Sequence, residues 1–332
     1  MLIDVVAHIA ASPTAVEAAA VAAENDGYDG FGAPETRHDV FTALTLAARA
    51  TSSITLQSAI AVAFARNPMS VAVLANDLQL ISSGRFQLGL GSQVQAHIER
   101  RFAMPWSRPA ARMEEFLAAI RAIWQSWASG DRLRFTGEFY AHTLMTDFFN
   151  PGPNPHGNPP ILLAAVGERM TAVAARVADG LMCHSFTTDA YLREHTLPTL
   201  REVRGSLDGF AISLAALTIL GDDEKARAVA EKAVRGQIAF YGSTPAYRPV
   251  LDLHGWGELH ERLNAMSRRQ AWAEMADAID DDVLAAFAVS GTATEVAAAI
   301  TARFGGMVDR ISLYTPYDVA PEQLAAVAAA LR

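Results

Sequence analysis

ITLQSAIAVAF (residues 54–64), NPMSVAVLANDLQLISSG (67–84) and RFQLGLG (85–91) follow one another almost without a break. The first and third stretches are apolar runs of a length typical of buried strands. The middle stretch predicts a helix, because Asn67 can cap its N-terminus and Pro68 suits its first turn. Its buried face is expected to consist of Val71, Leu74, Leu78 and Ile81. Because the connections are short, we expect the two strands to be parallel and joined by a crossover helix.

The same alternation of strand and helix recurs along the whole chain. Further strands are predicted at residues 2–7, 28–32, 161–166, 180–184, 211–220 and 308–314. Thr292 and Glu295 have the spacing of a capping box, which predicts a helix before the last strand. Eight strands alternating with helices favour a closed (β/α)8 TIM barrel over an open doubly wound sheet. We expect residues 1–332 to form a single domain of this kind.

Two stretches are longer than this alternation needs. About residues 92–160 follow the fourth strand and contain a predicted helix, a predicted hairpin around residues 134–140 and a Pro-rich loop. About residues 241–282 follow the seventh strand and are predicted to be mostly helical. Loops that leave the C-terminal ends of barrel strands build the active site of such a fold. Both insertions are therefore expected to cover the mouth of the barrel.

Composition and charge argue against several classes of protein. The formal net charge is −9 and no long basic run is present, which disfavours a nucleic-acid partner. No apolar run is long enough to span a membrane, and Met1-Leu2-Ile3-Asp4 does not resemble a secretion signal, so a cytoplasmic protein without a membrane partner is expected. Cys183 is the single cysteine and the nine histidines are scattered, which disfavours a disulfide framework and a metal site.

Common catalytic motifs are missing from the sequence. Gly89-Leu90-Gly91-Ser92-Gln93-Val94 begins like a dinucleotide-binding loop, but Val94 stands where that loop needs its third glycine. No Walker loop, no Gly-x-Ser-x-Gly elbow and no His-Glu-x-x-His helix occurs. A barrel without a nucleophile or a metal can carry out difficult chemistry with a bound organic cofactor.

Two segments of the fold-determining stretch carry a family resemblance. Ala63-Phe64-Ala65-Arg66-Asn67-Pro68 and the run from Leu78 to Gly91 closely resemble the strand–helix–strand signature of luciferase-like monooxygenases and F420-dependent oxidoreductases. This resemblance implies a flavin-like ring across the C-terminal mouth of the barrel. It also implies a non-prolyl cis peptide at Ala59-Ile60, or one residue earlier.

Two further segments favour one branch of that superfamily. Glu35-Thr36-Arg37-His38-Asp39 and the run from Ser92 to His97 look more like the actinobacterial F420-using branch than like the FMN monooxygenases. The resemblance therefore implies an oxidoreductase that transfers hydride between coenzyme F420 and a small organic substrate, and it implies a homodimer. Two alternatives stay open: an FMN-dependent monooxygenase that needs a reductase partner and oxygen, and a barrel that binds a cofactor or ligand without turnover.

Three histidines are candidates for the proton donor because imidazole titrates near neutral pH. His8 ends the first strand, His38 follows the second and His97 follows the fourth. His8 could instead be an ordinary pore-lining residue. The resemblance also places an acidic residue of the second loop, Glu35 or Asp39, beside the ring, although Asp39 could equally serve as a helix cap.

The remaining candidates are cofactor contacts. Ser92, Gln93 and Gln95 offer neutral hydrogen-bonding groups after the fourth strand, or they are ordinary loop residues. Gly167, preceded by Ala165 and Val166, begins a helix whose free backbone N–H groups suit a phosphate, although Glu168 would repel an anion. His184 ends the sixth strand as a possible pocket residue, and Cys183 is expected to be an inert buried thiol. Several aromatic residues could line the pocket or serve as packing: Trp106, Tyr241, Tyr247 and Trp256.

Overall fold

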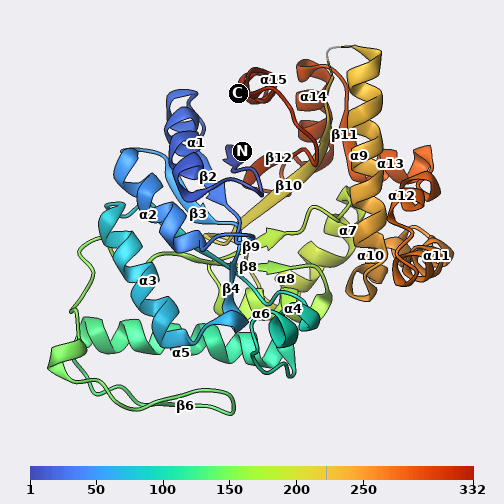
Figure 1. Ribbon diagram of the computed structural model, residues 1–332. Coiled ribbons are helices and arrows are strands. Elements are labelled where there is room, and N and C mark those ends of the chain that lie inside the picture. Colours follow the sequence, from blue (N-terminus) through green and yellow to red (C-terminus); the bar gives the residue numbers. More distant parts are fainter. Residues whose placement is uncertain (222) are drawn as a thin grey trace.

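Eight parallel strands close into a barrel in the computed structural model, which describes residues 1–221 and 223–332 (Figure 1). In spatial order they are β12 (Arg310–Tyr314), β1 (Leu2–Val6), β2 (Gly30–Ala33), β3 (Thr55–Ser58), β5 (Phe86–Gly91), β8 (Ile161–Ala165), β9 (Gly180–Cys183) and β10 (Ala211–Ile219). The barrel is closed because β10 pairs with β12 on one edge and with β9 on the other. The predicted TIM barrel is confirmed.

A layer of helices surrounds the strands (Figure 1). Its members are α1 (Pro13–Asn25), α2 (Val40–Ala50), α3 (Pro68–Ile81), α5 (Pro109–Ser129), α6 (Glu168–Val177), α8 (Leu197–Arg204), α14 (Ala293–Phe304) and α15 (Pro321–Leu331). Asn67 caps α3 and Thr292 forms a capping box at α14, as predicted. The predicted buried face of α3 is wrong at Ile81, which is exposed at the end of the helix. Among the described helices, none is both long and apolar enough to cross a bilayer.

The predicted continuous strand over residues 54–64 is wrong, because the strand is interrupted in its middle. β3 ends at Ser58, the Ala59-Ile60 peptide is cis, and β4 (Ala61–Val62) resumes the pairing with β5 before a short 3-10 turn. The cis bond itself lies where the family resemblance places it. At the interruption the Ser58 hydroxyl replaces the backbone ladder, since Oγ accepts from Gly89 N at 2.9 Å and donates to Gly89 O at 2.8 Å.

One short strand is absent from the sequence prediction. β11 (Ala288–Ser290) follows α13 (Asp281–Phe287) and pairs with the C-terminal end of β10. Leu217 of β10 is in register with both Tyr314 and Ala288, so β11 lies on the edge of β10 opposite β12, beyond the end of β9. Three residues are too few to show a strand periodicity, so only the packing against β10 reveals it.

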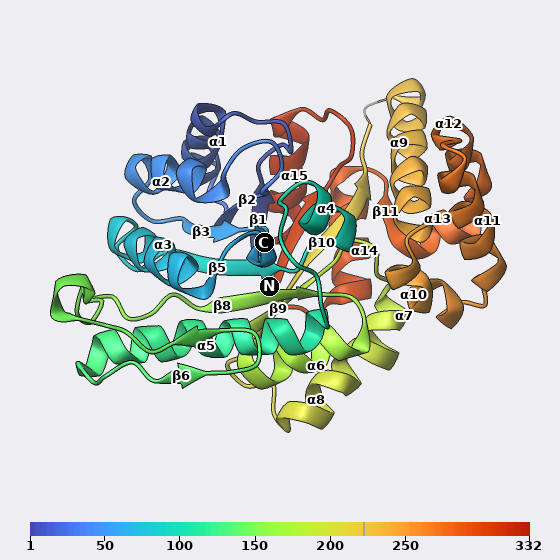
Figure 2. The same ribbon diagram turned by 60° about the horizontal axis from the view of Figure 1, so that its bottom comes forward.

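Residues 92–160 divide between the barrel mouth and its outside. α4 (Gln95–Arg100) lies just after β5, whereas α5 packs between α3 and α6 as a member of the outer layer. The predicted hairpin is present as β6 (Phe135–Thr136) and β7 (Ala141–His142). Figure 2 shows α5 and this hairpin on the outside of the barrel, alongside β8. Much of this insertion therefore belongs to the outer layer.

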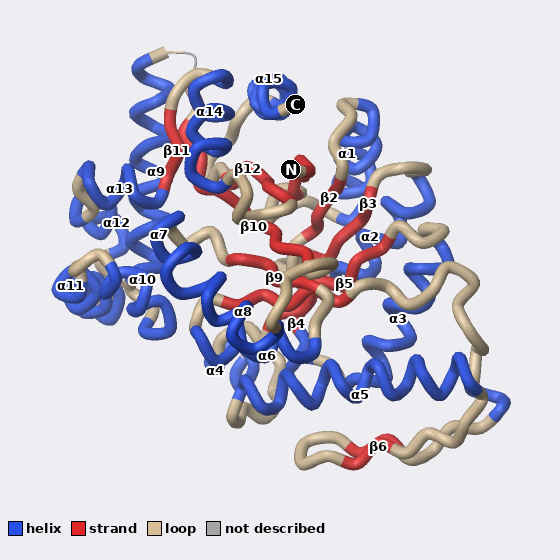
Figure 3. Tube along the Cα trace, turned by 180° about the vertical axis from the view of Figure 1, so that it is seen from behind, coloured by secondary structure: helices blue, strands red, loops and turns tan. Residues whose placement is uncertain are grey.

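Residues 241–282 are mostly helical, as predicted. They form a short 3-10 turn (Pro245–Tyr247), α10 (Arg248–Leu253), α11 (Gly257–Arg268) and α12 (Trp272–Met275), and they pack against α9 (Glu224–Gly242). Figure 3 shows α9 to α13 gathered on one side of the barrel. Their apolar side chains form a second hydrophobic cluster that includes Phe186, Leu217 and Ile219 of the barrel.

Candidate active site

Small residues face the barrel interior at the C-terminal ends of β2, β5 and β8. A Cβ at Gly32 would lie 3.1 Å from Ala59 Cβ, and a Cβ at Gly91 would lie 2.8 Å from Ile60 Cδ1 and 3.7 Å from Ala164 Cβ. The side chains of the two residues joined by the cis peptide, Ala59 and Ile60, therefore pack against the backbone at this end of the barrel. Several interior-facing side chains are partly exposed, so this end is open to solvent: Val6, Ile60, Ala164 and Met182.

The opposite end of the interior is closed by polar side chains. Arg310 donates two hydrogen bonds to Asp4, at 2.8 Å and 2.6 Å, and both side chains are buried. Gln57 donates to Gln87 at 3.3 Å in the same region of the barrel. Because paired charges and amides fill this end, the open end beyond the strands is the candidate site.

Glu35 and Asp39, both expected to contact a cofactor, are bound together by Arg66. Arg66 Nη2 lies 2.6 Å from Glu35 Oε1 and 2.6 Å from Asp39 Oδ2, and Glu35 Oε2 also accepts from Val62 N at 2.7 Å. Asp39 is in addition the N-cap of α2 and accepts a hydrogen bond from Thr42 N at 2.8 Å, which confirms the alternative prediction that it serves as a helix cap. Burial would raise the pKa of Asp39, but the hydrogen bonds from Thr42 and Arg66 outweigh it and lower the pKa. These carboxylates thus tie the β2 loop to the segment after the cis peptide.

The three candidate histidines lie on loops that are bonded to one another. The Thr36 hydroxyl, two residues before His38, donates to the carbonyl of Ile9, next to His8. Arg101, at the end of the helix that carries His97, donates to Thr36 O at 2.6 Å. All three imidazoles are exposed. The tertiary structure therefore connects three loops that are far apart in the sequence.

The polar residues after β5 are held mainly by local hydrogen bonds. Gln93 adopts a left-handed backbone conformation with φ of 59°, and its side chain accepts from Val94 N at 2.9 Å. Ser92 donates to Gln93 O at 3.1 Å, and Gln95 donates to Glu99 at 3.0 Å. Each side chain is at least partly exposed. The loop thus presents neutral polar groups just beyond Gly91.

Ala165, Val166 and Gly167 lead from β8 into α6. Gly167 is the N-cap of α6 and has no side chain, so it cannot accept a hydrogen bond from the first backbone N–H groups of this helix. A Cβ at Gly167 would have no neighbour within 4 Å, so this helix start has open space around it. Glu168 lies in the first turn and disfavours an anion there. This helix start can accept a phosphate only if Glu168 turns away.

His184 lies inside a cluster of tyrosines that the sequence indicated only in part. The His184 ring is 4.6 Å from that of Tyr241 and 4.7 Å from that of Tyr247. The Tyr241 and Tyr314 hydroxyls are 3.4 Å apart. Tyr314 was not singled out from the sequence, although its position at the end of the last predicted strand was a usable signal. Cys183 is buried, and burial raises the pKa of its thiol to about 12, as expected of an inert cysteine.

We expect His184 to stay neutral in acid and to make the fold acid-sensitive. Burial lowers the pKa of His184 from 6.5 to about 4. Between these two values His184 binds a proton in the unfolded chain but stays unprotonated in the folded protein. The free energy of unfolding therefore falls as the pH falls through this window, by up to about 2 kcal/mol at pH 5. Urea denaturation at pH 7 and pH 5 checks this: His184→Gln should lose less stability than the native protein over the same step. Equal losses would contradict it.

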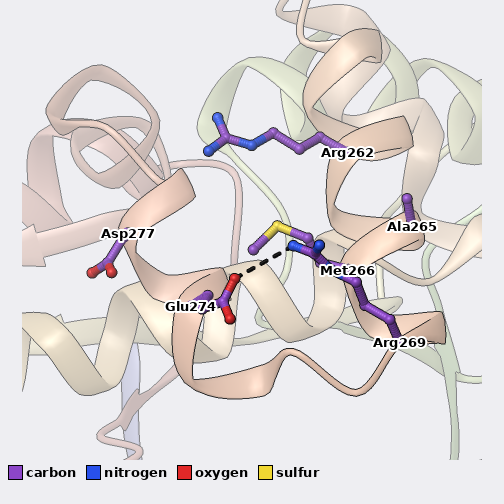
Figure 4. Close-up of a pocket in the computed structure, with 6 residues that line it drawn as sticks. All are labelled: Arg262, Ala265, Met266, Arg269, Glu274 and Asp277. Atoms are coloured by element: carbon purple, nitrogen blue, oxygen red, sulfur yellow. Dashed lines mark hydrogen bonds and ion pairs between the residues drawn. The ribbon is translucent and has the colours of Figure 1, made fainter.

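A separate hollow lies away from the strand ends. It is formed by α11 and α12 together with the turn that follows them, and Figure 4 shows its six lining residues: Arg262, Ala265, Met266, Arg269, Glu274 and Asp277. Arg269 and Glu274 are 3.4 Å apart across it. No strand-end residue lines this hollow. Within residues 1–221 and 223–332, no group of three or more histidine, cysteine, aspartate or glutamate side chains could hold a metal ion.

The family model of luciferase-like monooxygenases matches residues 4–310 of the chain. The chain belongs to the luciferase-like monooxygenase family. An uncharacterised member from Mycobacterium tuberculosis is 49% identical over 297 residues, covering 88% of this chain and 87% of that protein. A 5,10-methylenetetrahydromethanopterin reductase of Archaeoglobus fulgidus is 27% identical over 284 residues, covering 82% of this chain and 81% of that protein.

Solved structures of this luciferase-like fold include enzymes with different cofactors. The coenzyme F420-dependent tetrahydromethanopterin reductase from Methanopyrus kandleri has a TM-score of 0.78 at 18% identity, covering 98% of this chain and 96% of that one. The oxygenating constituent of a diketocamphane monooxygenase from Pseudomonas putida, in complex with FMN, has a TM-score of 0.68 at 16% identity, covering 98% and 96%. Both show that the fold is shared.

Proposed function

We propose that this luciferase-like protein is an oxidoreductase that transfers hydride between coenzyme F420 and a small organic substrate. The observation that carries the proposal is the open C-terminal end of the barrel, where the partly exposed side chains of Ile60, Ala164 and Met182 could border a flat ring beside the cis peptide. The reductase relatives favour F420 over FMN. Ala165, Val166 and Gly167 would border the cofactor, with its phosphate at the start of α6.

Bound F420 in its reduced form would supply the hydride for a carbonyl substrate, and the chain would supply position and a proton. Ser92, Gln93 and Gln95 would donate hydrogen bonds to polar atoms of the ring. Glu35 and Asp39 would act through Arg66, by fixing the loop on which His38 lies, rather than by touching the ring. One of His8, His38 and His97 would give a proton to the substrate oxygen when hydride reaches the neighbouring carbon.

The proposal extends to the state of the protein in the cell. We place it in the cytoplasm as a homodimer with no nucleic-acid or membrane partner. Three apolar side chains of the segment after β7 support a dimer, because Leu144, Phe148 and Phe149 are 77%, 88% and 70% exposed. Exposed apolar patches of this kind mark association surfaces.

Titration of the purified full chain with F420 and with FMN tests the cofactor. We expect F420 to bind, with quenching of its fluorescence, and FMN to bind at least tenfold more weakly. Turnover is then followed by F420 absorbance, with oxidised F420 for secondary alcohols and with reduced F420 for enones. Tight FMN binding without F420 binding would support the FMN-dependent monooxygenase with a reductase partner, and binding without turnover would support a cofactor-binding barrel.

A further inference from the structure

Four ring side chains lie together over one side of the barrel mouth, above β9, β10 and β12. Tyr314 ends β12 in the same alternation as Arg310, whose side chain faces the interior, so Tyr314 also faces inward. His184 follows β9 in the alternation of Met182, whose sulfur lies 2.7 Å from where a Cβ on Gly89 would be. Tyr241 and Tyr247 reach the same place from α9 and from the turn after it. We call these four residues the ring cluster.

The hydroxyls of the ring cluster are only loosely engaged. Tyr241 and Tyr314 are joined by a 3.4 Å contact between their hydroxyls, and Tyr247 meets His184 Nε2 at 3.3 Å. Hydrogen bonds between hydroxyl groups are normally 2.7–2.8 Å long. All four side chains are partly exposed. The hydroxyls of Tyr241 and Tyr314 can therefore turn to a ligand oxygen without leaving a strong bond behind.

Three members of the ring cluster, His184, Tyr247 and Tyr314, are held in their uncharged forms. Burial raises the pKa of Tyr247 to about 12 and also raises that of Tyr314, while it lowers the pKa of His184 to about 4. A carboxylate or ammonium placed among these rings would lose its hydration without gaining an opposite charge, which is costly. Flat apolar groups pack well against such rings, and a single oxygen can be hydrogen-bonded by the hydroxyls.

We propose that the ring cluster is the substrate site and that it selects uncharged molecules with a flat apolar body and one carbonyl or hydroxyl oxygen. Tyr241 and Tyr314 would bind that oxygen, while His184 and Tyr247 would pack on the body of the molecule. The inference rests on the proposed function only for the reaction of the bound molecule with the cofactor. The binding preference can be measured without cofactor.

Acetophenone and 4-acetylbenzoate are matched probes, since they differ only by a carboxylate. Their dissociation constants are measured on the full chain by ligand-observed NMR, with and without F420. We expect acetophenone to bind at least about tenfold more tightly than 4-acetylbenzoate. Loss of both hydroxyls in the double variant Tyr241→Phe, Tyr314→Phe should weaken acetophenone binding about tenfold, as expected for about 1.4 kcal/mol of hydrogen bonding.

Tyr28→Phe is the matched control. Tyr28 lies just before β2, at the closed end of the barrel, so this variant should bind acetophenone like the native protein. Circular dichroism checks that each variant is folded, and the single variant Tyr314→Phe replaces the double one if the latter is not. Equal binding of the two probes, no binding of acetophenone, or unchanged affinity in the folded tyrosine variant would each overturn the inference. If F420 fails to bind while these preferences hold, the proposed function is wrong and the site stands.

Discussion

Gly89→Ala should destabilise the fold by about 3 kcal/mol or more, because the added methyl group has no space. A Cβ at this position would lie 1.9 Å from the backbone oxygen of Ser58 and 2.7 Å from the sulfur of Met182. Met182 can change rotamer, but the Ser58 carbonyl cannot move without disturbing the interruption between β3 and β4. Denaturation by urea at neutral pH measures the loss as a lower midpoint of unfolding.

Gly236→Ala is the matched control for this substitution. Gly236 lies within α9, and a Cβ there would have no neighbour within 4 Å. Alanine favours a helix over glycine by about 1 kcal/mol, so the same chemical change should here raise stability. If Gly89→Ala unfolds at the same urea concentration as the native protein, the close approach of β5 to the end of β3 is wrong.

His38→Asn should lower the turnover of F420 by about 10²-fold to 10⁴-fold, the usual contribution of a positioned proton donor. Among the three candidates His38 is our first choice, because its neighbour Asp39 is fixed by Arg66 and by the start of α2. The dissociation constant of F420 should change by less than about threefold, since asparagine keeps a polar side chain of similar size. Single-turnover absorbance measurements separate these two effects.

His156→Asn provides the comparison for the histidine variants. His156 is exposed and lies beside Gly84, in the loops that precede β5 and β8 at the closed end of the barrel. This variant should turn over like the native protein. If His38→Asn is as active as His156→Asn, the donor is His8 or His97, and if their variants are active too, the proton does not come from these histidines.

Several individual features were predictable from local sequence because their causes are local. Asn67, Pro68 and the Thr292–Glu295 pair start helices through hydrogen bonds within one turn. The parallel barrel follows from eight short apolar runs separated by helical stretches, a pattern that closes with few alternatives. The position of the cis peptide came from the family resemblance, since nothing in the composition of residues 54–64 distinguishes an interrupted strand from a continuous one.

In the candidate site, too, some features could be predicted from the sequence and others could not. That His8, His38, His97 and His184 follow strands could be read from the sequence, and parallel strands bring such ends to one face. The binding of Glu35 and Asp39 to Arg66 could not, because it joins residues about 30 positions apart through side-chain geometry. The same holds for the contact of Tyr241 with Tyr314 across 73 positions.

By itself, then, the sequence determined most of the helices, the eight barrel strands, the closed barrel and the end of the barrel at which the candidate site lies, because periodicity and capping act over a few residues. Only the tertiary structure decided which polar side chains are hydrogen-bonded to one another and which can still bind a ligand. Which loops pair with one another depends on where each strand end lies around the barrel. The pKa of a group such as His184 depends on how deeply its side chain is buried. Neither quantity is present in the order of residues along the chain.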